Sequence, residues 1–279
     1  MHIDAAPHYG LRPGSRYILL NARVLLDAAE EYFIDAQSGM LFFIAPAGID
    51  PATEPVVLSQ QQHAHTMNGT ANVRVEGMRF EYSQGSAVQA LNVTRVTVAN
   101  CTVANAGTQG VNITGASSTL SFSTVHSAGC EGISFSGGDT VSLTRGNISI
   151  QNNTITRFAR VSRTIRPGIG WSGCGNTVVG NEISDAPHSG IMISPASDGR
   201  GVDTLFEGNH LHDLCKGTAD AGGFYAGASW ANRGNRIINN RFERFYQTEK
   251  MAQSTSINGI CKRRTQRAHD LLCLEPHSL

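Results

Sequence analysis

Residues 176–193 read NTVVGNEISDAPHSGIMI, three short apolar segments separated by glycine, asparagine, aspartate and proline. The middle segment begins at Asn181 and recurs along the chain. Its copies begin at Asn153, Asn181, Asn209 and Asn240, at steps of 28, 28 and 31 residues, with a looser copy at Asn100. A unit this short, without helical periodicity, indicates a solenoid whose turns stack on one another.

The two flanking segments recur in the same way. A segment like 176–179 precedes most copies, and a glycine-led segment follows, at Gly110, Gly132, Gly168, Gly190 and Gly222. Three short strands per turn predict an all-β fold, a right-handed parallel β-helix, with equivalent residues of adjacent coils about 4.8 Å apart. The inward column is Ile155, Ile183, Leu211 and Phe242, and the outward column beside it is Thr154, Glu182, His210 and Arg241.

The repeat pattern divides the chain into three parts. Residues 71–246 are predicted to form the coils. Residues 1–70 form an irregular segment that leads into them and contains a β-hairpin turning at 37–39. Residues 247–279 match no further coil and form a non-repeat tail. We expect the β-helix to be incomplete at both ends, because an open last coil exposes a strand edge that a cap normally covers.

The composition excludes several classes of function. Lys plus Arg and Asp plus Glu are both 22, and this zero net charge argues against a nucleic-acid surface or a polybasic membrane tether. No apolar stretch is long enough for a transmembrane helix, and the first residues lack the pattern of a secretory signal. No nucleotide-binding glycine motif occurs. We expect a monomer without a cofactor.

One predicted column carries two aspartates. Four residues after each repeat asparagine stand Arg157, Asp185, Asp213 and Arg244. Adjacent coils should bring Asp185 and Asp213 about 5 Å apart, close to the carboxyl separation of retaining glycosidases. One pKa of such a pair should rise unless a cation relieves it. Both aspartates are therefore candidate catalytic residues; the alternative is a structural ladder compensated by the flanking arginines.

A second column stands two residues before the glycine-led strands. It holds Arg166, His188 and Asp220, and Lys216 lies just ahead in an insertion of four residues. A cation can hold a sugar carboxylate while an imidazole or carboxylate moves a proton. His188 and Asp220 are therefore candidate catalytic residues, and Arg166 and Lys216 candidate substrate contacts. The alternative is a row of surface salt bridges, which contributes little.

Tyr225, Trp230 and Arg233 follow this column. An exposed aromatic ring can stack on a sugar, so the three are candidate substrate contacts, although Trp230 could equally cap a loop. His63 and His65 have the spacing of a metal-binding pair. No third ligand has a predictable position, so no metal site is predicted.

Three segments resemble one known family: residues 32–43, residues 181–192, and residues 212–216 followed by 220–225. They are similar to the right-handed parallel β-helix proteins related to glycoside hydrolase family 141, which includes fucosidases and xylanases, over about residues 15–246. The resemblance implies hydrolysis of a glycan outside the cell and adds His212 as a substrate contact. The family pattern has an acidic residue where this chain has Ser229, and it has further coils at both ends.

Three functions follow. The first is a glycoside hydrolase that acts on a polysaccharide. The second is a polysaccharide lyase on the same scaffold, with Lys216 or Arg166 as the base and a uronate as the substrate. The third is a non-catalytic glycan-binding or structural β-helix, a truncated and inactive relative, which Ser229 favours.

Overall fold

A computed structural model describes residues 19, 21–54, 57–194, 200–218, 220–227 and 230–246. They belong to two compact units that divide between Val57 and Leu58. The predicted tail, 247–279, and Ser229 lie outside the described residues. Within the described ranges, no helix has the length and apolar character needed to cross a membrane.

The first unit contains the predicted hairpin. After the short 3-10 helix η1 (Arg23–Leu25), strand β1 (Tyr32–Asp35) pairs antiparallel with β2 (Met40–Phe43). The carboxylate of Asp35 fastens the turn by accepting hydrogen bonds from Gln37 N (3.0 Å) and Ser38 Oγ (2.7 Å). The turn closes at Gly39, whose φ of 68° lies in the left-handed region that glycine adopts without strain.

The second unit consists of three sheets, to which each coil contributes one strand. Sheet 1 contains β3 (His65–Asn68), β6 (Val88–Thr94), β9 (Val111–Ala116), β12 (Ile133–Asp139), β16 (Ile169–Cys174), β19 (Ile191–Ile193) and β23 (Phe224–Tyr225). Sheet 2 contains β4 (Arg74–Glu76), β7 (Thr97–Ala99), β10 (Thr119–Ser121), β14 (Ser149–Gln151), β17 (Thr177–Val179), β21 (Leu205–Glu207) and β24 (Arg236–Ile238). Sheet 3 contains β5 (Arg79–Glu81), β8 (Thr102–Ala104), β11 (Thr124–His126), β15 (Thr154–Thr156), β18 (Glu182–Ser184), β22 (His210–Leu214) and β25 (Arg241–Phe245).

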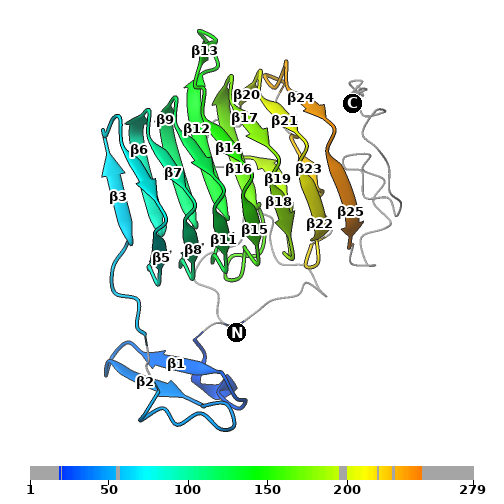
Figure 1. Cartoon of the computed structure of the whole chain (residues 1–279). Helices are drawn as coiled ribbons and strands as arrows, with labels where there is room; N and C mark the ends of the chain where they lie inside the picture. Colours follow the sequence, from blue (N-terminus) through cyan, green and yellow to red (C-terminus); the bar gives the residue numbers. More distant parts are fainter. Residues whose placement is uncertain are drawn as a thin grey trace. The chain divides into compact units, whose positions relative to one another are not determined.

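Successive coils pair strand on strand in parallel, so the strands of each sheet stack in chain order (Figure 1). Two short strands lie off this path: β13 (Thr144–Arg145) pairs antiparallel with β12, and β20 (Gly201–Val202) pairs with β16. The first coil begins at β3, within the segment predicted to be irregular. The prediction of a parallel β-helix is confirmed.

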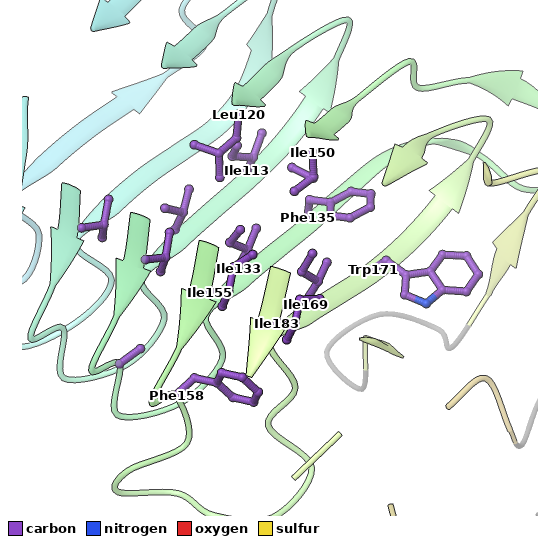
Figure 2. Close-up of a cluster of buried hydrophobic side chains, with 14 of the residues drawn as sticks. Ile113, Leu120, Ile133, Phe135, Ile150, Ile155, Phe158, Ile169, Trp171 and Ile183 are labelled. Carbon is purple, nitrogen blue, oxygen red and sulfur yellow. The ribbon is translucent and has the colours of Figure 1, made fainter. Parts of the chain in front are cut away.

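The inward column of sheet 3 is buried as predicted. Ile155 and Ile183 have no exposed surface (Figure 2). Leu211 has none either, and Phe242 packs against the core. The glycines that precede the strands of sheet 1 lie directly opposite this column, inside the coil. A Cβ added at Gly190 would stand 2.5 Å from Leu211 Cδ2, and one added at Gly223 would stand 2.7 Å from Phe242 Cδ1. The glycine-led pattern therefore reflects a lack of space inside the coil.

The last coil corrects one predicted register. Ile191 pairs with Phe224, which places Gly223, and not Gly222, opposite Gly190. Gly223 holds the inward site because a Cβ there would meet Phe242, whereas a Cβ at Gly222 would meet only a carbonyl oxygen at 3.3 Å. The residue two before the glycine is therefore Ala221, and Asp220 lies one position outside the predicted column.

The repeat asparagines form a hydrogen-bonded ladder inside the coils. The backbone N–H and the Nδ2 of Asn153 both donate to Oδ1 of Asn181, each at 3.0 Å. Asn181 donates in the same way to Asn209, and Asn209 to Asn240, at 2.9–3.0 Å. All four are buried. The ladder satisfies backbone groups at the turn between sheets 2 and 3, which explains why asparagine recurs there.

Candidate functional site

The connections from sheet 3 to sheet 1 differ in length, and two long ones form a pocket with a short one between them. Residues 127–132 and 185–190 are short connections, whereas 157–168 and 215–223 are longer. Residues of the connections 157–168, 185–190 and 215–223 line an open pocket of about 240 Å³. It is lined by Arg157, Phe158, Ala159, Arg160, Arg163, Asp185, Ala186, Pro187 and Lys216. Longer loops on a rigid scaffold are the usual place for a binding site.

The charge of this pocket is mainly positive. Three guanidinium groups and one ammonium group line it, against the single carboxylate of Asp185. Lys216 Nζ donates to Asp185 Oδ1 at 2.6 Å, so that carboxylate is matched by one cation. Both side chains of this pair are well exposed, and such a pair contributes little stability. Among the described residues, the pocket lining contains no second carboxylate beside Arg157, Arg160 and Arg163.

The predicted aspartate column lies at or next to the C-terminal end of four sheet 3 strands, β15, β18, β22 and β25. Ser184 pairs with His212, which places Asp185 and Asp213 next to one another in register. Arg157, Asp185, Asp213 and Arg244 all have positive φ, between 47° and 55°. The chain leaves the strand at this residue after β15 and β18, whereas β22 and β25 continue one residue further, where Leu214 pairs with Phe245.

Asp213 is the most strongly bound carboxylate of this column. It accepts hydrogen bonds from Arg244 Nε (2.9 Å) and Nη2 (2.6 Å), from His212 Nδ1 (2.7 Å) and from Tyr246 Oη (3.1 Å). The Arg244 guanidinium and the other donors hold the pKa of Asp213 far below its usual range. Each aspartate forms an ion pair with a cation, Asp185 with Lys216 and Asp213 with Arg244, as the ladder alternative expects. Asp213 is therefore ionised at neutral pH.

His188 is buried, with only 3% of its surface exposed, in the connection 185–190 that precedes β19. Its Nδ1 has no hydrogen-bond partner among the described residues. Burial lowers the pKa of His188 to about 4, although the negative charge of Asp220 opposes that shift. The imidazole is therefore neutral at physiological pH.

This buried imidazole should make stability depend on pH. The folded chain keeps His188 neutral down to about pH 4, whereas the unfolded chain takes up a proton at its ordinary pKa of 6.5. Between these values the unfolded state binds more protons, so the free energy of unfolding falls as pH falls. Between about pH 7.5 and about pH 4.5, the wild type should lose about 2–3 kcal/mol more than His188→Gln in urea unfolding. Parallel losses in the two proteins would contradict the assignment.

Arg166 has a structural partner. Its Nη1 donates to Glu131 Oε1 at 2.9 Å and its Nε to Ser162 Oγ at 3.3 Å. Glu131 is 4% exposed, so this ion pair ties the 157–168 connection to the previous coil. The ion pair with Glu131 is of the kind that the salt-bridge alternative predicts. Contact of Arg166 with substrate remains a prediction.

The other predicted contacts lie at the opposite end of strand β23. Tyr225 pairs with Met192 within sheet 1. Trp230, 90% exposed, and Arg233, which bridges to Val202, follow in the connection to β24. The pocket, by contrast, lies in the connections that precede sheet 1. The structure therefore brings together three pairs of predicted site residues, namely Asp185 with Lys216, His212 with Asp213, and His188 with Asp220. Tyr225, Trp230 and Arg233 do not line the pocket.

Two groups were missed by the sequence analysis. Arg160 and Arg163 line the pocket, but they lie in a connection that no repeat aligns. Glu182, His210 and His212 bring ligand atoms within 4.8 Å of one another and could hold a metal ion. The signal was present in the alignment, since Glu182 and His210 share a column and His212 lies two residues further on the same face.

With three parallel sheets, an inward asparagine ladder and a pocket at the loop edge, the chain is a right-handed parallel β-helix protein. A family model described as a right handed beta helix region matches residues 56–155. No curated protein sequence matches the chain.

Two solved structures are similar to the chain at low sequence identity. Pectate lyase Pel9A has a TM-score of 0.46 and 17% identity, over 67% of this chain and 51% of that one. The A-module of the Azotobacter vinelandii mannuronan C-5 epimerase AlgE4 has a TM-score of 0.46 and 11% identity, over 64% of this chain and 54% of that one. The chain thus spans about half the length of the structures it matches.

Proposed function

We propose that this β-helix is a carbohydrate-active protein that binds an acidic polysaccharide at the pocket between residues 157–163, 185–187 and 216. The carrying observation is the charge of that pocket: four cations surround one carboxylate. Guanidinium groups bind carboxylates through paired, charge-assisted hydrogen bonds, so a uronate-bearing chain fits them better than a neutral sugar. Monomeric state and a location outside the cell belong to the same proposal.

The pocket supports binding more directly than it supports hydrolysis. A hydrolase of the predicted type needs one carboxyl group that donates a proton. Asp213 is unsuited to that step because its pKa is lowered, and the charge of Asp185 is offset by Lys216. Hydrolysis remains the second candidate, favoured by the neighbouring positions of the two aspartates and by the resemblance to glycoside hydrolase family 141. Asp213 would then act as nucleophile or electrostatic stabiliser.

The binding proposal predicts a charge-dependent affinity. The full chain should bind polygalacturonate, or alginate, and not a neutral galactan of similar length. Removing two pocket cations in Arg160→Ala/Arg163→Ala should weaken binding about tenfold or more, since each charge-assisted hydrogen bond contributes about 1.5 kcal/mol or more. The measurement is affinity electrophoresis or calorimetry at two salt concentrations, and the residual binding should fall further with salt.

The matched control removes two exposed arginines from sheet 2. Arg74→Ala/Arg236→Ala lowers the net charge equally but lies on β4 and β24, away from the pocket. It should bind as the wild type does. Equal weakening in both double variants, or equal affinity for the neutral galactan, would refute a specific acidic-sugar site.

Products separate the remaining activities. Bound polysaccharide is incubated with the wild type and with Asp213→Asn, and reducing ends and the absorbance of unsaturated sugars are both followed. Reducing ends without absorbance, lost in the variant, indicate hydrolysis. Absorbance that depends on Lys216 indicates a lyase. Binding without products assigns the chain to the glycan-binding class.

A further inference from the structure

The outer face of sheet 3 carries a cluster of two imidazoles and one carboxylate. His210 and His212 stand two residues apart on β22, and their ring centroids are 4.4 Å apart. Glu182, on the neighbouring strand β18, pairs in register with His210. Ligand atoms from all three residues lie within 4.8 Å of one another. Glu182 is exposed, so an ion can reach them from solution.

The two ring nitrogens of His212 face different groups. Its Nδ1 lies 2.7 Å from Asp213 Oδ2 and 3.1 Å from Arg244 Nη2, and these contacts fix the orientation of the ring. Its Nε2 lies 3.2 Å from Oε1 of Glu182, whose side chain is exposed. A nitrogen of His212 and an oxygen of Glu182 are therefore already close enough to bind one common ion.

We propose that Glu182, His210 and His212 form a zinc site. Two imidazole nitrogens and one carboxylate oxygen, with an open position for water, are a common zinc ligand set. The same ligands disfavour Ca²⁺ and Mg²⁺, which prefer oxygen alone. Zinc–ligand bonds of about 2.0–2.2 Å require the ligand atoms to close in slightly, which the exposed Glu182 side chain can do.

Further carboxylates orient both imidazoles. Asp213 fixes the His212 ring and is itself held by Arg244 and Tyr246. Glu243, which is largely buried on β25, lies with Oε2 3.4 Å from His210 Nε2. Carboxylates that hydrogen-bond the second nitrogen of a ligating histidine are typical of zinc sites and raise ligand basicity. Asp213 is accordingly a positioning residue of this site.

The test is zinc binding by the full chain, without reference to activity. Zn²⁺ alone is titrated in competition with a fluorescent zinc indicator, and Co²⁺ is added separately to record visible absorption. The wild type should bind Zn²⁺ far more tightly than Ca²⁺ or Mg²⁺. Glu182→Gln, His210→Ala and His212→Ala should each weaken binding about tenfold or more, and Asp213→Asn about tenfold through the orientation of His212.

His126→Ala is the matched control. His126 occupies the same sheet 3 column as His212, separated from it by Thr156 and Ser184. Its Nδ1 lies 3.1 Å from Ser127 Oγ and 3.3 Å from Arg157 Nη2, where the Nδ1 of His212 contacts the carboxylate of Asp213. The control should bind zinc as the wild type does.

The outcomes are distinguishable from those of the polysaccharide assay. Unchanged zinc affinity in His210→Ala/His212→Ala, or equal weakening in His126→Ala, would overturn the zinc site, as would zinc binding no tighter than that of Ca²⁺. Far-UV circular dichroism shows whether each variant is folded. Glu182→Gln, which changes one exposed side chain, keeps the test decisive if a histidine variant does not fold.

Discussion

Asn181→Ala should destabilise the coils by about 3–5 kcal/mol in urea unfolding, a large effect for one side chain. The variant removes the acceptor of both the backbone N–H and the Nδ2 of Asn153, and the donor to Ile150 O (2.9 Å). These groups are buried, and each unsatisfied one costs about 1–3 kcal/mol. Alanine cannot replace any of these bonds.

Asn152→Gly is the control for the ladder. Asn152 is the exposed neighbour of Asn153, and its φ of 54° is one that glycine adopts readily. Its free energy of unfolding should change by less than about 1 kcal/mol. If Asn181→Ala were no more destabilising than this control, the ladder would have little energetic weight.

Trp171→Ala should also cost about 3–5 kcal/mol, in this case through a cavity. Trp171 has no exposed surface and points into the coil beside Ile169 (Figure 2). Its ring meets Phe206 edge to face, with centroids 4.9 Å apart, and Gly201 lies against its six-membered ring. Three strands therefore close around one side chain, and an alanine leaves a void that they cannot fill.

The other tryptophan of the chain provides the control. Trp230 is 90% exposed, and Trp230→Ala should leave the free energy of unfolding within about 0.5 kcal/mol of the wild type. Trp171→Phe should fall between the two, because it keeps most of the ring and removes an Nε1–H that has no partner among the described residues. Equal stability of Trp171→Ala and Trp230→Ala would contradict this account of the core.

Much of the fold could be predicted because the repeat constrains it. Spacing of the asparagines predicted the columns, and both the ladder and the inward column of Ile183 and Leu211 follow it. The pattern was ambiguous where Gly222 and Gly223 are adjacent, since either could occupy the inward position. The close approach of Phe242 leaves room for a glycine only at 223, so Gly223 occupies it. That single shift moved Asp220 out of its predicted column.

The candidate site could be predicted only in part. Asp185 and Asp213 are neighbours in register because both belong to the repeat. Their cations, Lys216 and Arg244, come from the following coil, and Lys216 lies in an insertion whose path the repeat does not describe. The pairing of charges in these loops depends on how the longer connections fold over one another.

The sequence by itself determined the class of fold, since stacking requires equivalent residues at equivalent positions and the chain repeats them. It also determined that aspartates of adjacent coils lie side by side. Only the tertiary structure decided that Arg160 and Arg163 share a pocket with Lys216, and that Glu182 meets His212 diagonally across two strands. The physical reason is that backbone register follows from periodicity, whereas contacts between long side chains depend on loop paths and rotamers, which have no period.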